Sequence, residues 1–149
     1  MNKATVDSIY VAESRGSFQK AIPTAQLKVG LGLEGDRFFN TGIVTLIELE
    51  RIVQFIEDTG LDIGFGETRR NIVTKHLRLN ALVGKEFVIG EARLLGTELC
   101  EPCASLGKRL SNTRLTPREI VKAFTHKAGI RAKIIASGSI TPGTLIQTI

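Results

Sequence analysis

The sequence predicts a mainly β protein with a few helices, formed as a single domain of residues 1–149. Short segments rich in β-branched residues alternate with glycine-containing turns, and only a few stretches have the spacing of an amphipathic helix. A chain of 149 residues with 42% hydrophobic content can bury one core of its own. Short strands joined by glycine turns are typical of a compact β-barrel.

The first part of the chain is expected to form strands. Thr5–Ala12 mixes β-branched, aromatic and polar residues and is expected to be the first strand. Around Pro23, the segments Gln19–Ile22 and Ala25–Val29 are expected to form a short hairpin. The glycine-rich stretch Gly30–Arg37 is either a turn or a loop whose backbone N–H groups face an anion.

The strand predicted at Ile43–Ile47 runs into the clearest helix of the sequence, Glu48–Asp58. Apolar residues recur at helical spacing, and they are Leu49, Ile52, Val53 and Ile56. Gly60 is expected to end this helix. Because the opposite face is charged, the helix is expected to cover the core and to have no chemical role.

The second half predicts more strands and two short helices. Leu82–Gly90 and Ala92–Leu99 are expected to be consecutive strands, and Ile134–Ala136 a later one. Ala104–Leu110 is expected to be a short helix. Thr116–Phe124 begins with a threonine cap, a proline and a glutamate three residues after the cap, which is the pattern of a capping box.

Composition and charge exclude several classes of protein. The formal charge of +5 favours anionic ligands, but no recognition motif indicates specific nucleic-acid binding. No signal peptide and no membrane-spanning apolar run is present, so we expect a soluble, cytoplasmic protein. In such a reducing compartment the two cysteines would be free thiols.

Both cysteines lie in the stretch Thr97–Cys103, and the residues alone leave four interpretations open. A zinc site would require His76, His126 or carboxylates to converge on Cys100 and Cys103. A thioredoxin-like pair would exchange disulfides, whereas two buried cysteines would only pack. The fourth interpretation is a transition-metal or sulfur-transfer site, because thiolate sulfur is a soft donor and a strong nucleophile.

Several motifs, taken in order, resemble the molybdenum cofactor sulfurase C-terminal domain family, called the MOSC domain. The resemblance spans essentially the whole chain. It rests on Gly32–Arg37, Arg70–Thr74, Leu82–Gly84 with Phe87–Gly90, Thr97–Cys103 and His126–Arg131. It implies a compact MOSC-type β-barrel in a member without the additional domains of larger family enzymes. Phe38, and Lys85 or Thr144, depart from the family's usual residues.

The resemblance also implies a site and a cofactor. It makes Cys103 the metal-binding and catalytic thiolate, with Cys100 as a second catalytic candidate, and it makes molybdenum cofactor (molybdopterin) the expected ligand. The residues implied to bind the phosphate or the pterin are Arg70, Asn71, Arg37, Asp36, His126 and Arg131.

Three functions follow as alternatives. The chain carries the cofactor or its sulfur through a Cys103 thiolate or persulfide, or it is a molybdenum-dependent reductase of N-hydroxylated compounds. The third is a thioredoxin-like dithiol protein. The implied partners are a pyridoxal-phosphate-dependent sulfurase or cysteine desulfurase for sulfur carriage, and an electron-transfer protein for reduction.

Overall fold

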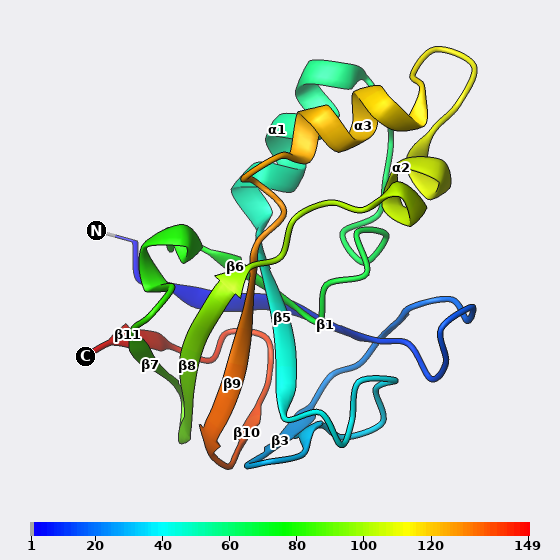
Figure 1. Ribbon diagram of the computed structural model, residues 1–149. Coiled ribbons are helices and arrows are strands. Elements are labelled where there is room, and N and C mark those ends of the chain that lie inside the picture. Colours follow the sequence, from blue (N-terminus) through cyan, green and yellow to red (C-terminus); the bar gives the residue numbers. More distant parts are fainter. Residues whose placement is uncertain (1) are drawn as a thin grey trace.

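The computed structural model describes residues 2–149, which form an α+β fold of one large sheet, one small sheet and three α-helices (Figure 1). In chain order, the elements are β1 (Thr5–Val11), β2 (Lys20–Ala21), β3 (Ala25–Lys28), β4 (Gly32–Leu33), β5 (Ile43–Glu48), α1 (Leu49–Thr59), β6 (Ile72–Lys75), the 3-10 helix η1 (Leu79–Leu82), β7 (Glu86–Ile89), β8 (Ala92–Leu99), α2 (Ala104–Leu110), α3 (Pro117–Phe124), β9 (Ile130–Ala136), β10 (Gly138–Ile140) and β11 (Ile146–Thr148).

The large sheet has the strand order β11-β7-β8-β9-β5-β6-β1-β2, and the small sheet has the order β10-β3-β4. The expected mainly β fold with a few helices is confirmed, but the large sheet does not close into the expected barrel. An isolated bridge between Thr5 and Leu145, with backbone hydrogen bonds from Val6 to Thr144 and from Gly143 to Val6, joins β1 to the residues before β11 without forming a regular strand pair. The short length of β11 and the switch of β10 into the small sheet leave too few paired residues for closure.

The unit β5-α1-β6 matters most for the sites described below. β5 and β6 are parallel neighbours, with Leu46 opposite Ile72 and Glu48 opposite Thr74. Their carboxyl ends therefore lie at one edge of the sheet, and the residues that precede β6 lie at the opposite edge. Two cavities of the molecule lie at these two edges.

The three helices gather at one end of the molecule, above the strands in Figure 1. They share a second core with the end of the sheet, and the rings of Phe55 and Phe124 stack there with centroids 4.5 Å apart. Gly129 lets the chain pass from α3 to β9 across β5. A Cβ atom at this position would lie 1.8 Å from the carbonyl oxygen of Leu46, and its φ of +93° favours glycine.

Local signals predicted most elements, but not all of their partners. The capping box at Thr116 and the left-handed C-cap at Gly60 are confirmed. The hairpin around Pro23 is wrong, because β2 pairs with β1 whereas β3 pairs with β10 and β4.

Three further expectations need correction. Val53, expected on the apolar face of α1, is 36% exposed. Phe55, which was not expected there, is buried in the core with Ile52. The strand expected at Leu82–Gly90 begins only at Glu86, because Leu79–Leu82 forms the 3-10 helix. β9 begins four residues earlier than expected, at Ile130.

No helix within residues 2–149 combines the length and the apolar character needed to cross a membrane.

Candidate functional site

Cys103 lies at the N-cap of α2, directly after the loop that follows β8, and its side chain is exposed. It lines a pocket of about 660 Å³. The pocket walls come from four regions distant in sequence: the loop after β1, the loop after β4, the residues before β6, and α2 with its N-cap. The lining residues are Glu13, Ser14, Arg15, Arg37, Phe38, Thr68, Arg69, Arg70, Cys103, Ser105, Leu106 and Arg109. We call it the arginine pocket.

The surroundings of Cys103 favour its thiolate. Partial burial is the largest single influence and raises the pKa of the thiol. The backbone N–H groups of Leu106 and Ser105 oppose it, although Sγ forms no regular capping hydrogen bond. Arg70 and Arg109 add positive charge. Together these groups lower the pKa of Cys103 below its usual value, which is the condition for a reactive or metal-binding cysteine.

The pocket concentrates positive charge beside this thiol. Burial first, and then repulsion from a neighbouring guanidinium, lowers the pKa of Arg37, Arg69 and Arg109. The strongest repulsion comes from Arg69 at Arg37, from Arg109 at Arg69, and from Arg37 at Arg109. Like charges held together in this way are stabilised by an anion that enters between them.

Arg37 comes from the glycine-rich loop and lies over the ring of Phe38, with its guanidinium carbon 4.6 Å from the ring centroid. Such a cation–π contact fixes the direction of the guanidinium without neutralising it. Phe38 therefore contributes a flat support for Arg37.

Arg69 holds the loop after β1 at the edge of the pocket. Its guanidinium donates to the carbonyl oxygens of Ser14, Arg15 and Ser17. Its backbone has a φ of +62°, a conformation that is unusual for a residue with a side chain. Its buried Nε atom has no hydrogen-bond partner within residues 2–149. This unpaired donor belongs to a residue that lines the pocket, and a charged N–H group of this kind suits an anionic oxygen.

Arg70, which the sequence put forward as a phosphate ligand, is buried and already holds backbone groups. Its Nε donates to the carbonyl of Ala128 at 2.9 Å, Nη1 to Thr68 at 3.2 Å and Nη2 to Cys100 at 2.8 Å. It thus joins the cysteine loop to the turn before β9, and it also contributes positive charge to the pocket.

Asn71 and Asp36 also have structural partners. Asn71 Oδ1 accepts from the backbone N–H and the hydroxyl of Thr45, and Nδ2 donates to the carbonyl of Tyr10 at 3.1 Å. These contacts fasten β1, β5 and β6 together. The carboxylate of Asp36 accepts from the backbone N–H groups of Ala12 and Phe38, which fixes the loop that carries Arg37.

His126 and Arg131 are not brought to the arginine pocket. His126 is exposed, and its Nδ1 lies 2.6 Å from Oε2 of Glu101 while its backbone N–H donates to Oε1. Arg131 pairs with Glu98 on the neighbouring strand at 3.4 Å. His126 contacts the cysteine loop through Glu101, whereas Arg131 lies on the exposed face of β9.

The two cysteines differ in their surroundings. Cys100 is buried, and two hydrogen bonds fix its backbone. Its N–H donates to the carbonyl of Gly129, and its carbonyl accepts from Nη2 of Arg70. Within residues 2–149, no group of three or more histidine, cysteine or acidic side chains could hold a metal ion. The zinc interpretation is therefore not supported by these residues. The burial of Cys100 supports a site with one exposed thiol more than an exchanging pair.

The residues of the pocket fit an anionic cofactor that offers a metal to a thiolate. One thiol of lowered pKa stands among guanidinium groups, and one buried guanidinium N–H has no partner. Arg109 and Arg15 belong to the pocket but were missed in the sequence. The helix expected at Ala104–Leu110 puts Arg109 six residues after Cys103, but whether its side chain faces the thiol depends on how Leu106 and Leu110 pack.

Comparisons with known proteins agree with this fold. The family model described as the MOSC domain matches residues 36–147. The YuaD protein of Bacillus subtilis is 17% identical, with a TM-score of 0.84, and the match covers 97% of this chain and 94% of that chain. No curated protein matches the chain.

Two further solved structures share the fold. The YiiM protein of Geobacillus stearothermophilus is 18% identical, with a TM-score of 0.78, over 98% of this chain and 75% of that chain. The YiiM protein of Escherichia coli is 19% identical, with a TM-score of 0.72, over 100% of this chain and 70% of that chain. Because the family model covers most of the sequence, the chain belongs to the MOSC domain family.

Proposed function

We propose that this protein binds molybdenum cofactor and carries the cofactor or its sulfur through Cys103. The observation that carries the proposal is a single exposed thiol of lowered pKa in an arginine-lined pocket of about 660 Å³. The cofactor, when bound, supplies a molybdenum ion that accepts a thiolate ligand, and soft metals favour such sulfur donors.

The arginines have separate tasks in this proposal. Arg37 and Arg109 face the anionic parts of the cofactor, because they line the pocket and belong to none of the ion pairs found within residues 2–149. Arg69 adds positive charge at the pocket wall and holds the loop after β1. Arg70 holds the cysteine loop in place, and its charge favours the thiolate of Cys103.

Sulfur carriage requires a donor that bears a persulfide, such as a cysteine desulfurase. The Cys103 thiolate attacks the terminal sulfur of the donor persulfide and forms a new S–S bond. The donor's own S–S bond breaks, and the donor leaves as a thiolate. Electrons balance without an added oxidant, because one persulfide replaces another.

Reduction of an N-hydroxylated compound is the second candidate, favoured by the space beside Cys103. A pocket of about 660 Å³ is in the size range of small-molecule sites. Cleavage of one N–O bond to give N–H and water consumes two electrons and two protons. An electron-transfer protein would have to supply the electrons.

The test is the molybdenum and pterin content of protein purified without oxygen from a host that makes the cofactor. We expect near-stoichiometric metal in the natural protein and none in Cys103→Ala, while Cys100→Ala loses less because Cys100 is buried outside the pocket. Equal losses in the two variants, with both folded, would overturn the assignment of Cys103. Absence of metal from the natural protein would leave sulfur carriage, visible as a persulfide mass on Cys103.

A further inference from the structure

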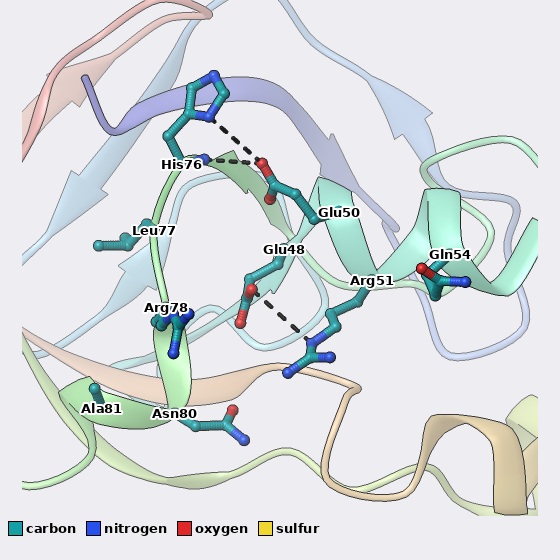
Figure 2. A pocket seen from close by; sticks show the side chains of 9 residues that line it. All are labelled: Glu48, Glu50, Arg51, Gln54, His76, Leu77, Arg78, Asn80 and Ala81. Carbon is teal, nitrogen blue, oxygen red and sulfur yellow. Dashed lines mark hydrogen bonds and ion pairs between the residues drawn. The ribbon is translucent and has the colours of Figure 1, made fainter. Parts of the chain in front are cut away.

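A second cavity, of about 780 Å³, lies at the other end of β6 from the arginine pocket (Figure 2). We call it the Glu48 pocket. Its lining residues are Glu48, Glu50, Arg51, Gln54, His76, Leu77, Arg78, Asn80 and Ala81. Glu48 ends β5 and His76 follows β6, so the cavity lies beyond the carboxyl ends of two parallel strands. Ligands commonly bind at such edges in sheets with parallel strands.

Glu48 carries a carboxylate that is poorly satisfied by the protein. Its side chain is only 12% exposed, and Oε2 accepts one hydrogen bond, from the backbone N–H of Leu79 at 3.2 Å. The Nε atom of Arg51 is 4.0 Å from Oε1, beyond hydrogen-bond distance. Burial is the main influence on this group and raises its pKa. A partly buried carboxylate in this state is stabilised by a cationic N–H donor.

Glu50 gives the cavity a second carboxylate. Its Oε2 accepts the backbone N–H of His76 at 2.9 Å and lies 3.8 Å from Nδ1 of the same residue. His76 has a φ of +61°, so the chain turns sharply after β6 at this contact. Glu48 and Glu50 thus give the cavity lining two carboxylates, which attract an ammonium group.

Arg51 and Arg78 provide the opposite charge. In the view of Figure 2, the carboxylate of Glu48 lies between their side chains, and both arginines oppose the raised pKa of Glu48. Arg78 belongs to none of the ion pairs found within residues 2–149. Guanidinium groups at this position suit a carboxylate.

We propose that the Glu48 pocket binds a small zwitterion of the amino-acid type. Its ammonium group contacts Glu48 and Glu50, and its carboxylate contacts Arg51 and Arg78. The charges of these four residues balance. An anion alone leaves the partly buried carboxylate of Glu48 without a cationic partner, and a cation alone leaves the guanidinium groups without an anionic one. The proposal is independent of the function assigned to Cys103.

The experiment follows the backbone N–H signals of ¹⁵N-labelled full-length protein by NMR during titration with glycine, L-alanine and L-glutamate. A few charged hydrogen bonds support a Kd of ~1 mM. We therefore expect at least one of the three amino acids to shift the signals of Leu79 and His76 at concentrations below about 50 mM. Acetate and ethylammonium, which each carry one of the two charges, should bind about tenfold more weakly or worse.

Variants test the contributions of the acidic and the basic residues of the pocket separately. Glu48→Gln keeps an acceptor for Leu79, and it should weaken binding of the amino acid about tenfold, as should Arg78→Gln. Glu86→Gln and Arg93→Gln, which alter an exposed ion pair on β7 and β8, are the matched controls and should bind normally. The proposal is overturned if no amino acid shifts these signals, if acetate or ethylammonium binds equally well, or if the pocket variants bind like the controls.

Discussion

The two ends of the parallel pair β5 and β6 carry charges of opposite sign, a buried arginine and a partly buried glutamate, and these two side chains have different partners. At the end that precedes β6, Arg70 donates to four backbone carbonyls, those of Ala128, Thr68, Cys100 and Glu101. At the carboxyl ends of β5 and β6, Glu48 accepts one backbone N–H, and its nearest ion-pair partner, Arg51, is 4.0 Å away. Arg70 therefore acts as part of the framework, whereas Glu48 is available to a ligand.

The surrounding charges differ in the same way. The arginine pocket is dominated by guanidinium groups and contains the one exposed cysteine within residues 2–149. The Glu48 pocket mixes two carboxylates with two guanidinium groups and has no thiol in its lining. Cavities of similar size in one small fold are thus suited to different ligands, an anion at a reactive sulfur and a zwitterion.

The largest effect is expected for Arg70→Met. The variant leaves the carbonyls of Ala128, Thr68 and Cys100 without their buried donor, and about 1 kcal/mol for each gives a loss of ~3 kcal/mol in the free energy of unfolding. Urea unfolding monitored by circular dichroism measures it. Arg109→Met is the control and should cost less than about 0.5 kcal/mol, because Arg109 lies at the pocket surface. Equal losses would remove the distinction between framework and pocket arginines.

A smaller effect is expected for Arg109→Gln on the chemistry of Cys103. Loss of one nearby positive charge should slow reaction with a dianionic aromatic disulfide about fivefold at low salt, the scale of one partly exposed charge pair. A neutral dipyridyl disulfide should be slowed less, and added salt should shrink the difference. Arg93→Gln, on β8 away from the pocket, serves as the control. If both reagents slow equally, the arginines do not select for anions.

The smallest effect is expected for Glu48→Gln on stability. The folded pKa of Glu48 is raised by burial, so the unfolded chain releases this proton first as the pH increases. The contribution of Glu48 to stability is therefore lost between its ordinary unfolded pKa and its raised folded pKa. The free energy of unfolding of Glu48→Gln should equal that of the natural protein at pH values below this window. Above the window it should be higher, by less than about 1 kcal/mol. Unfolding curves from acidic to neutral pH would contradict this if the difference had the opposite sign.

Local patterns predicted the elements that local contacts determine. The capping box at Thr116, the helix after Cys103 and the glycine end of α1 are set by residues within a few positions of one another. The pairing of β3 with β10 joins segments more than 100 residues apart, and no turn signal encodes it. The sequence could therefore indicate strands but not show that the barrel stays open.

The candidate site follows the same rule. The motif around Cys103 marked the thiol, but the burial of Arg70 and Asn71 depends on carbonyls and hydroxyls from distant strands. The sequence alone places Arg70 and Asn71 at the ligand, because these distant partners cannot be identified from it. Arg15, by contrast, carries no local signal and reaches the pocket only because Arg69 holds its loop there.

The pH dependence of alkylation of Cys103 by iodoacetamide tests the central claim most directly, because a neutral reagent reports the thiolate itself. Cys100→Ser removes the second thiol, and mass spectrometry of the modified peptide gives the rate at each pH. We expect the alkylation rate to have its pH midpoint clearly below the ordinary cysteine pKa of about 8.5, and we expect this midpoint to move upward in Arg109→Gln. A midpoint at or above the ordinary value, unchanged by Arg109→Gln, would contradict an activated thiolate in the arginine pocket.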